Sequence, residues 1–326
     1  MTLKQEKDYC NIKEHYMVNA EKLFFIRFLF LFMAVVTGMN SLNAQALFQG
    51  LSHPVNSRGW AMGEAVSTLN SDGTGILFNP AALSNAAPSL QLSMTNFVLG
   101  IHSTNACAVF DSKIGKIGAA MKYLDYGAFT ERDKYGTDIG EFRVNDYYFN
   151  LVYGRSISRH LNLGFSAGLA NSELNSLSSR AIIGSIGLLY FEKKSSLSIG
   201  LSYNNFGKIT KTYISNESPL YGGFILGVSK HLEHLPMIIS SDICQVQKDE
   251  YIVKVGGEFD FRDMFFLRWG MTTKGWQLNT VQNFSSFFAG TSLGMGLKLG
   301  KMAIDLAVVT LGDAGQITSF TLSRDH

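Results

Sequence analysis

The sequence predicts an all-β fold: a transmembrane antiparallel β-barrel of about 14 strands with a short N-terminal hatch in its lumen. Three observations support this prediction. Fourteen short amphipathic segments follow one another from Ser89 to Ser323, tight turns alternate with longer polar loops between them, and a secretion signal precedes them. A closed antiparallel barrel is the β-architecture that pairs every backbone N–H and C=O inside a bilayer.

The composition agrees with such a barrel. The 326 residues include 32 glycines, only 5 prolines, 24 phenylalanines and 13 tyrosines, which suits Gly-rich strands with aromatic girdles. The net charge of +2 gives no indication of nucleic-acid binding. We expect no cofactor, no metal site and no nucleic-acid partner.

Residues 1–46 are expected to be an N-terminal extension and a signal peptide that is cleaved. Basic residues precede the apolar run Phe28–Val36, and Ala44-Gln45-Ala46 offers an A-x-A-like cleavage site. Cleavage is expected after Ala46, with Ala44 as the competing site. Met17 is an alternative start, because residues 1–16 do not resemble the beginning of a signal peptide. The apolar run is too short to span a bilayer as a helix.

The three cysteines add little. Cys10 leaves with the extension, while Cys107 and Cys244 fall within predicted strands. An exported protein permits a disulfide, but nothing in the spacing specifies pairing, which is left open. No cysteine stands directly after the cleavage site, as lipid attachment would need, so a lipid anchor is not expected.

Residues 47–88 are predicted to be a hatch, that is, a non-strand segment folded into the lumen. The segment lacks strand alternation, and Asn79-Pro80 is a turn signal because proline restricts its predecessor and cannot donate a ladder hydrogen bond. It is too apolar for a free linker, and a barrel of this width needs filling. The hatch residues that we single out are Arg58, Gly59, Met62, Gly63, Asn79, Pro80 and Ala81.

Residues 89–326 are predicted to form the barrel, because side chains alternate between two faces along each strand. In one segment Leu161 and Phe165 belong to an apolar face, and Asn162 and Gly164 to a small polar one. In a soluble sandwich the apolar face would turn inward, whereas in a membrane barrel it turns toward lipid. The predicted strands are 89–99, 105–112, 115–127, 142–157, 161–174, 180–193, 195–207, 221–232, 236–247, 249–261, 264–274, 286–300, 301–310 and 316–323.

The connections are predicted to differ between the two ends of the barrel. The tight links fall at Asp111–Gly115, Ser158–His160, Lys193–Ser195, Phe261–Met264 and Gly300–Lys301, and the long connections at Gly127–Glu141, Gly207–Leu220 and Lys274–Ser285. Short periplasmic turns and long outer loops are the outer-membrane pattern, and an even strand number places both termini in the periplasm.

Charged residues fall on the inward parity of the predicted strands. The charges expected in the lumen are Lys122, Asp146, Asp242, Lys254, Glu258, Asp260, Arg268, Lys298 and Asp305, whereas Val253, Val255 and Phe259 are expected to face lipid. A Lys or Arg that faces lipid at mid-bilayer costs about 2–4 kcal/mol. The mixed signs predict lumenal ion pairs, for example between Arg268 and the Glu258/Asp260 pair; a substrate or ion path is the alternative.

Short motifs follow in order along nearly the whole mature chain. They are Arg58–Glu64 (RGWAMGE), Phe78–Leu83 (FNPAAL), Tyr123–Gly127 (YLDYG), Gly140–Phe142 (GEF) leading into Asp146, Gly200–Gly207 (GLSYNNFG), Gly227–Lys230 (GVSK), Gly294–Lys298 (GMGLK) and Ser319–Ser323 (SFTLS). This order resembles the PorV/PorQ family of type IX secretion outer-membrane proteins, itself similar to the fatty-acid transporter FadL. The short hatch, the mature length and the His231–Pro236 turn look more like PorQ than PorV. The ending Arg324-Asp325-His326 departs from barrels that finish on an aromatic residue.

The resemblance implies a non-enzymatic role in the cell outer membrane of a diderm bacterium. PorV-like members carry cargo with a C-terminal signal domain from the translocon to the surface attachment complex, and PorQ-like members hold a surface component of that complex to the outer membrane. The implied partners are outer-membrane lipid and other type IX secretion or surface-attachment proteins. By analogy the working surfaces are the rim loops, including Thr130–Thr137 and Thr210–Ser218, which could equally be solvated spacers.

The main alternative is a FadL-like channel for uptake of hydrophobic compounds. There Phe78-Asn79-Pro80 would gate a lateral opening rather than form a structural turn, and lumenal apolar residues such as Leu124, Ile183 and Phe266 would line the path. The hatch disfavours an open porin. The absence of G-x-S-x-G, H-E-x-x-H and phosphate-loop motifs disfavours an enzyme, and the spacing of His231 and His234 is weak evidence for a metal.

Overall fold

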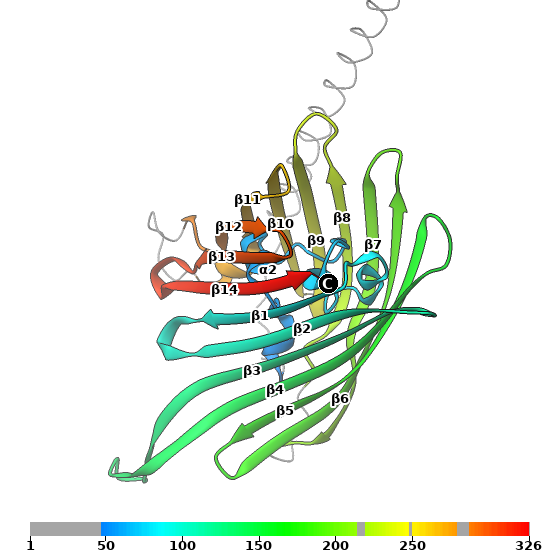
Figure 1. The fold of residues 1–326 in the computed structure, drawn as a ribbon. Helices are drawn as coiled ribbons and strands as arrows, with labels where there is room; N and C mark the ends of the chain where they lie inside the picture. The colour runs from blue at the N-terminus through cyan, green and yellow to red at the C-terminus, as the bar shows by residue number, and fades with distance from the viewer. Residues whose placement is uncertain (1–46, 214–218, 248–249, 279–286, 326) are drawn as a thin grey trace, which may run out of the picture.

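The computed structural model describes residues 47–213, 219–247, 250–278 and 287–325. The strands among them, from Ser89 onward, form one closed antiparallel sheet. Fourteen strands follow chain order around the barrel, and β1 closes it against β14 (Figure 1). The predicted barrel fold is therefore confirmed. The predicted extension and signal peptide at 1–46 lie outside the described residues.

The strand boundaries agree with most of the predicted spans. The strands are β1 (Ser89–Asn96), β2 (His102–Ser112), β3 (Gly115–Arg132), β4 (Asp138–Ser156), β5 (Leu161–Leu174), β6 (Leu177–Glu192), β7 (Leu197–Lys211), β8 (Gly223–His231), β9 (Met237–Gln247), β10 (Glu250–Phe261), β11 (Phe265–Thr272), β12 (Thr291–Leu299), β13 (Met302–Thr310) and β14 (Gln316–Asp325).

The helical elements are short. They are the α-helical turn α2 (Ser57–Ala61) and the 3-10 helices η1 (Gln49–Ser52), η2 (Gly73–Gly75), η3 (Pro80–Asn85), η4 (Val98–Gly100), η5 (Thr273–Leu278) and η6 (Gly312–Ala314). No helix among the described residues combines the length and the apolar character that crossing a membrane requires.

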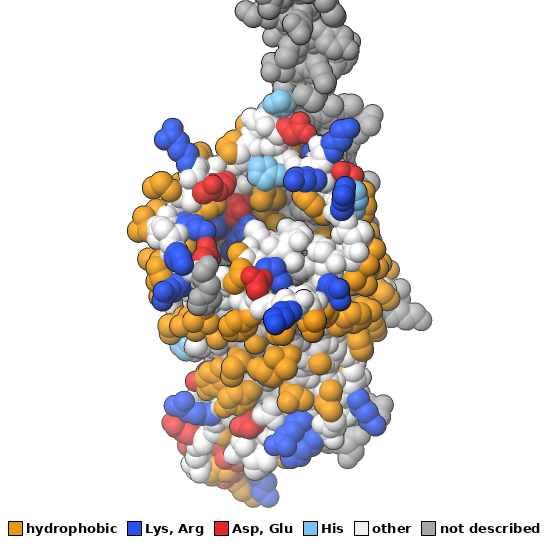
Figure 2. Space-filling model, turned by 45° about the vertical axis from the view of Figure 1, so that its right-hand side comes forward, with side chains coloured by type: hydrophobic (Ala, Val, Ile, Leu, Met, Phe, Trp, Pro, Cys, Tyr) orange, Lys and Arg blue, Asp and Glu red, His pale blue; other side chains and the backbone are white. Residues whose placement is uncertain are grey.

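Alternating burial separates an outer from an inner face along the strands, as β1 shows. Leu90, Leu92 and Met94 are exposed on the outside, whereas Gln91 and Ser93 are buried on the inside. The alternation arises because successive side chains point to opposite faces of a sheet. Figure 2 shows the result as a band of hydrophobic side chains across the visible wall, with charged side chains above and below it.

The outer wall is less exposed around β10 than the alternation predicts. Val253 and Val255 keep the outward parity, but they are only 2% and 6% exposed. Nearer the β10–β11 turn, Met237 and Trp269 belong to one packed cluster. The side chain of Trp269 covers β10 at Gly257, since a Cβ at Gly257 would lie 2.4 Å from Trp269 Nε1. The two valines thus keep the predicted outward direction but are buried rather than exposed there.

The predicted long connection Gly127–Glu141 is instead mostly strand. β3 and β4 pair with each other as far as Arg132 and Asp138. Their other neighbours, β2 and β5, end their pairing at Asp125 and Val144. Residues 126–143 consequently form a two-stranded arm that projects from the barrel, seen at the lower left of Figure 1. We call this segment the arm.

The connections at the two ends differ in length, although less than predicted. The turn end, where the predicted tight links lie, carries connections such as 113–114 and 300–301. The opposite loop end carries longer ones, such as 97–101 and 311–315, but also the two-residue turn 175–176. The arm also projects at the loop end.

Candidate functional site: the hatch inside the barrel

Residues 47–88 lie inside the barrel, where their apolar side chains pack on the inner faces of the strands (Figure 1). Ile76 and Leu83 share a buried cluster with Val109 of β2 and Val152 of β4. Removing such side chains from water is the main favourable term in folding. The hatch is thus packed against the wall as a core is, rather than suspended in an open bore.

The residues that the channel hypothesis assigns to an apolar path are distributed differently. Ile183 of β6 packs in a cluster with Phe48 of the hatch, and Leu124 is buried in the wall. Phe266 lies close to Arg268, whose guanidinium carbon is 5.2 Å from the centre of its ring. Ile183 and Phe266 therefore contact different groups, one apolar and one charged.

A ladder of alternating charges joins the hatch to three strands. Arg58 donates to Glu258 of β10 from Nε (2.8 Å) and from Nη2 (2.7 Å), and it is paired with Asp72 at 3.0 Å. Glu258 also accepts from Arg268 of β11 at 2.5 Å, and Arg268 pairs in turn with Asp305 of β13. A buried charge is stable only when it is paired. The ladder therefore fixes the hatch in one position against the wall.

A second ion pair lies beside an unusual stretch of hatch backbone. Gly63 and Glu64 both have left-handed φ angles, of 60° and 64°, which is uncommon for a residue other than glycine. Glu64 pairs with Lys254 of β10 at 2.9 Å, and the ammonium lies 4.9 Å from the centre of the Phe78 ring. Burial raises the pKa of Glu64, but the charges of Lys254 and Lys274 more than offset burial, so its pKa lies below the ordinary value.

Asp242 of β9 binds the hatch backbone directly. Its carboxylate accepts hydrogen bonds from the N–H groups of Val66 (3.0 Å) and Ser67 (2.9 Å) and from the Ser67 hydroxyl (2.6 Å). These bonds replace the water that a fully buried carboxylate has lost. Asp242, Lys254 and Glu258, three of the predicted lumenal charges, thus contact the hatch.

Asn79, Pro80 and Ala81 lie against glycines of the wall. The Asn79 side chain accepts from the Ala81 N–H (3.0 Å) and donates to a backbone carbonyl of β6 (3.0 Å). A Cβ at Gly187 would lie 1.9 Å from Asn79 Oδ1, and a Cβ at Gly164 would lie 2.1 Å from the Pro80 carbonyl carbon. The close approach of this turn therefore requires glycine at both wall positions.

The other hatch residues singled out in the sequence have backbone or core roles. The Gly59 N–H donates to the side chain of Asn56 (3.0 Å), and Met62 is fully buried in a cluster with hatch and wall residues. A Cβ at Gly63 would lie 2.4 Å from the backbone nitrogen of Met271. Gly63 is thus required both by its φ angle and by its contact with β11.

Asp260 and Lys298 find their partners at the turn end instead. Asp260 accepts from the N–H of Asp263 at 2.7 Å, so Arg268 pairs with only one of the two carboxylates that the sequence offered. Lys298 pairs with Asp325 of β14 at 2.6 Å. The example that the sequence offered, Arg268 with the Glu258/Asp260 pair, therefore holds for Glu258 alone.

Sequence reasoning expected Lys122 in the lumen but missed its role, and that of Ser57 and Ser319, in holding the hatch. The Lys122 ammonium of β3 donates to the backbone carbonyls of Gly50 (3.1 Å) and His53. The Ser57 hydroxyl hydrogen-bonds to the Ser319 hydroxyl of β14 (3.0 Å). The position of Ser319 on the lumen-facing side of β14 could have indicated a contact with the hatch. The partners of Lys122 were not predictable, because no sequence pattern indicates where a loop carbonyl points.

One inward carboxylate, that of Asp146, has partners within the wall. Asp146 of β4 accepts from the hydroxyls of Tyr126 (2.9 Å) and Tyr148 (2.6 Å). Cys107 and Cys244 are buried free thiols. Among the described residues no group of three or more His, Cys, Asp or Glu side chains is arranged to hold a metal ion.

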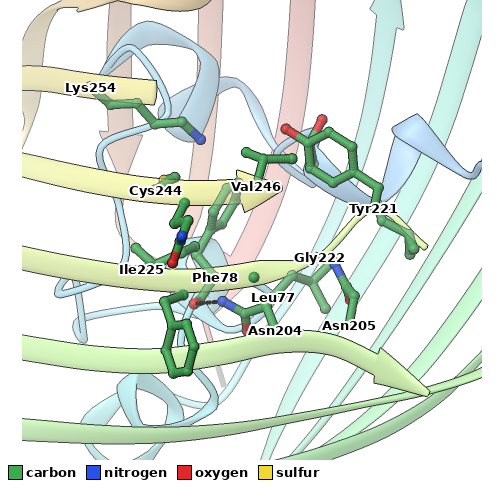
Figure 3. A pocket seen from close by; sticks show the side chains of 15 residues that line it. Leu77, Phe78, Asn204, Asn205, Tyr221, Gly222, Ile225, Cys244, Val246 and Lys254 are labelled. Atoms are coloured by element: carbon green, nitrogen blue, oxygen red, sulfur yellow. Dashed lines mark hydrogen bonds between the residues drawn. The ribbon is translucent and has the colours of Figure 1, made fainter. Parts of the chain in front are cut away.

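Two cavities of different size lie beside the hatch. A cavity of about 40 Å³ lies among Phe78, Ile225 and Lys254, and Asn204 donates to the Phe78 carbonyl (2.7 Å) at its edge (Figure 3). Such a volume has room for only a few waters. A larger charged cavity of about 270 Å³ lies around the ladder and reaches Asp325 at the turn end.

The fold is similar to that of solved outer-membrane channels. A mutant of the TodX monoaromatic hydrocarbon channel gives a TM-score of 0.60 at 11% identity, over 83% of this chain and 99% of that chain. The toluene transporter TodX of Pseudomonas putida gives 0.54 at 13% identity, over 82% and 96%. A FadL homologue of Pseudomonas aeruginosa gives 0.51 at 10% identity, over 84% and 98%. At these identities the likeness concerns the fold alone. No protein-family model and no curated protein sequence matches the chain.

Proposed function

We propose that the protein is a non-enzymatic outer-membrane component of the type IX protein secretion system, which tethers or shuttles secreted and surface proteins at the membrane. The observation that carries this proposal is the hatch, which buried ion pairs and hydrogen bonds join to β9, β10 and β14. A barrel whose lumen is occupied in this way offers partners a surface rather than a passage.

The membrane location rests on the outer face of the barrel. Leu92, Met94 and Leu293 are 52%, 60% and 66% exposed on the wall, which would be costly in water and is favourable against hydrocarbon. The fold likeness to outer-membrane channels supports the same location. With short turns in the periplasm, as in other outer-membrane barrels, the loop end faces the cell exterior. The leader predicted at 1–46 would direct export of the protein.

The assignment to the PorV/PorQ family rests on the motif order in the sequence. Two of its motifs, Arg58–Glu64 and Phe78–Leu83, contain the residues that bind the wall through Glu258, Lys254 and the backbone of β6. The family motifs thus coincide with the contacts that close the lumen. A PorQ-like tether is the role that best suits a barrel closed from within.

The arm supplies a surface for a protein partner. Its tip carries Tyr135, which is 80% exposed, and an ion pair between Arg132 and Asp138 (2.9 Å). Nearer the barrel the rings of Phe129 and Phe142 stack with their centres 5.6 Å apart. Exposed aromatic and arginine side chains are frequent anchors of protein interfaces.

Affinity purification of the tagged protein from gently solubilised outer membranes tests the tether. We expect a surface-exposed β-rich protein to co-purify, and a strain that lacks the barrel to release that same protein into the medium. An unrelated tagged outer-membrane barrel from the same membranes is the control. Recovery of the tagged protein with bound hydrophobic compound and without a protein partner would contradict the proposal.

A FadL-like channel for hydrophobic compounds is the second candidate, and one observation favours it. Asn204, Asn205 and Gly222 line both the small inner cavity and a cavity of about 550 Å³ at the β7–β8 boundary. The similar solved structures include a toluene transporter. Uptake of labelled toluene by liposomes that contain the purified protein tests this candidate, and the tether proposal expects uptake no faster than into protein-free liposomes.

A further inference from the structure

β7 loses one of its two neighbours halfway along its length. It pairs with β8 only from Leu197 to Asn204, but it pairs with β6 as far as Lys211. Among the described residues no strand pairs with the other edge of β7 between Asn205 and Lys211, a stretch that we call the β7 edge. An unpaired strand edge presents N–H and C=O groups that can accept a further strand.

A bulge at Asn205 causes the separation from β8. Asn205 has a left-handed φ of 55°, and the β6–β7 register shifts between Gly184 and Ile186. The Asn205 N–H donates to the Ser185 hydroxyl (3.1 Å) rather than to a strand carbonyl. Bulges bend a strand and re-aim its side chains, and here β7 continues with β6 alone beyond this point.

Space for another segment lies along the β7 edge. The cavity of about 550 Å³ is lined on one side by Phe206, Lys208 and Ile209, and on the other by Pro219 and Leu220 of the returning loop. Adjacent strands in a sheet lie about 4.8 Å apart. The cavity is thus bordered by the edge to which an added strand would bond and by a second wall.

Strand-like pairing already occurs on the second wall. Leu47, at the start of the hatch, forms a parallel bridge with Leu220. The Leu47 N–H donates to the Pro219 carbonyl (3.0 Å), and the Tyr221 N–H donates to the Leu47 carbonyl (3.2 Å). Extended backbone is therefore accommodated at this boundary. It lies on the loop side, and no other described strand pairs with the β7 edge.

The chemistry around the β7 edge indicates what fits there. Tyr203 and Phe206 stack with ring centres 5.6 Å apart, and Tyr203 lies 4.5 Å from the Phe224 ring, so the outer flank is aromatic. Of the described residues that line the cavity, Lys208 alone carries a charge, and Lys211 follows three residues further along β7. A complementary segment is apolar and carries a carboxylate.

We propose that the β7 edge binds an extended segment of a partner protein as an added β-strand. Its apolar side chains lie on the aromatic flank, and an acidic side chain or its C-terminal carboxylate lies at Lys208. The identity of this partner as a secreted or surface protein rests on the proposed function; strand addition itself does not.

Peptide binding to the full mature protein in lipid nanodiscs tests the proposal. The probe is a fluorescein-labelled heptapeptide of alternating valine and threonine that ends in aspartate with a free carboxylate. We expect saturable binding by fluorescence anisotropy. Lys208→Glu should weaken it by about tenfold, because a charge-assisted hydrogen bond to the peptide carboxylate is lost. Lys193→Glu, which changes an exposed lysine in the turn between β6 and β7, should leave the affinity unchanged.

A second peptide, with proline in place of each threonine, lacks the N–H groups that strand pairing needs and should not bind. Equal binding of both peptides, equal weakening by both lysine variants, or no binding of the first peptide would overturn the proposal. Heat-modified migration on gels verifies that each variant is a folded barrel. If the first peptide fails to bind while a surface protein still co-purifies, strand addition is overturned and the tether stands.

Discussion

At the scale of single residues, Glu258 joins the hatch to the wall. Its carboxylate accepts from Arg58 of the hatch and from Arg268 of β11, and it is only 3% exposed. Two guanidinium groups that share one carboxylate would repel each other without it. Glu258 is therefore the residue on which both the position of the hatch and the neutrality of this part of the lumen depend.

Substitution of Glu258 by glutamine should destabilise the barrel by about 3 kcal/mol, because it leaves two buried arginines without their shared anion. The measurement is equilibrium urea unfolding in phospholipid vesicles. The control is Lys298→Gln, which breaks the half-exposed pair with Asp325 and should cost less than about 1 kcal/mol. Equal losses in the two variants would show that the ladder does not hold the hatch.

Alanine at Gly164 or Gly187 should displace the hatch turn, because the new Cβ would lie 2.1 Å from Pro80 or 1.9 Å from Asn79. We expect a loss of about 2 kcal/mol or more and faster cleavage of the hatch in limited proteolysis. Gly140→Ala is the control, since the nearest atom to its Cβ would be 3.7 Å away. A hatch that stays protected in both wall variants would be inconsistent with these contacts.

The sequence indicated part of this residue-scale picture. Glu258 and Arg268 lie on the inward parity of adjacent strands and are direct register partners, so alternation alone predicted their pairing. Arg58 was singled out in a motif, but its pairing with Glu258 was not predictable, because it depends on the path of an irregular segment that has no periodicity. The same reason explains the missed bonds from Lys122 to loop carbonyls.

At the scale of elements, the arm is the least constrained part of the barrel. Its strands pair only with each other beyond Asp125 and Val144. Below these residues β3 and β4 each pair with two neighbours. The arm can consequently be shortened without removing a wall contact.

Replacement of Phe129–Phe142 by Asn-Gly should keep the barrel and remove the partner surface. The new two-residue turn joins Ala128 and Arg143, which are paired in the structure, and Asn-Gly suits such a hairpin. We expect heat-modified gel migration and unfolding midpoint close to the unchanged protein, with loss of the co-purified surface protein. Retention of the partner would place the tether surface elsewhere on the rim.

The positions of strands were predictable where one face of the strand contacts the hatch or water and the other face contacts lipid. β5 has the predicted bounds, 161–174, because its alternation is uninterrupted. The arm was predicted as a loop, because Glu131, Arg132 and Asp133 interrupt the apolar face once β3 leaves the wall. Hairpin pairing continues there, since a projecting ribbon needs no apolar face toward lipid.

At the scale of the whole molecule, the hatch decides whether the barrel conducts. In planar bilayers the complete mature protein should show no steady, large conductance, whereas a variant that lacks residues 47–88 should open an aqueous path through a lumen lined by polar side chains. Single-channel recording with matched protein amounts checks this. A steady current through the complete protein would favour the open-porin hypothesis.

The closure of the sheet also has a consequence for biogenesis. Ser57, in the first helical turn of the hatch, bonds to hydroxyls on β14, the strand that seals the seam with β1. Because β14 follows the other thirteen strands in the chain, chains that stop before Gln316 should be degraded faster in pulse-chase labelling than chains that stop after Asp325. A chain truncated before β14 lacks both the strand that closes the barrel and the hydroxyl groups that bind the start of the hatch. Truncation at one end therefore destabilises both ends of the protein.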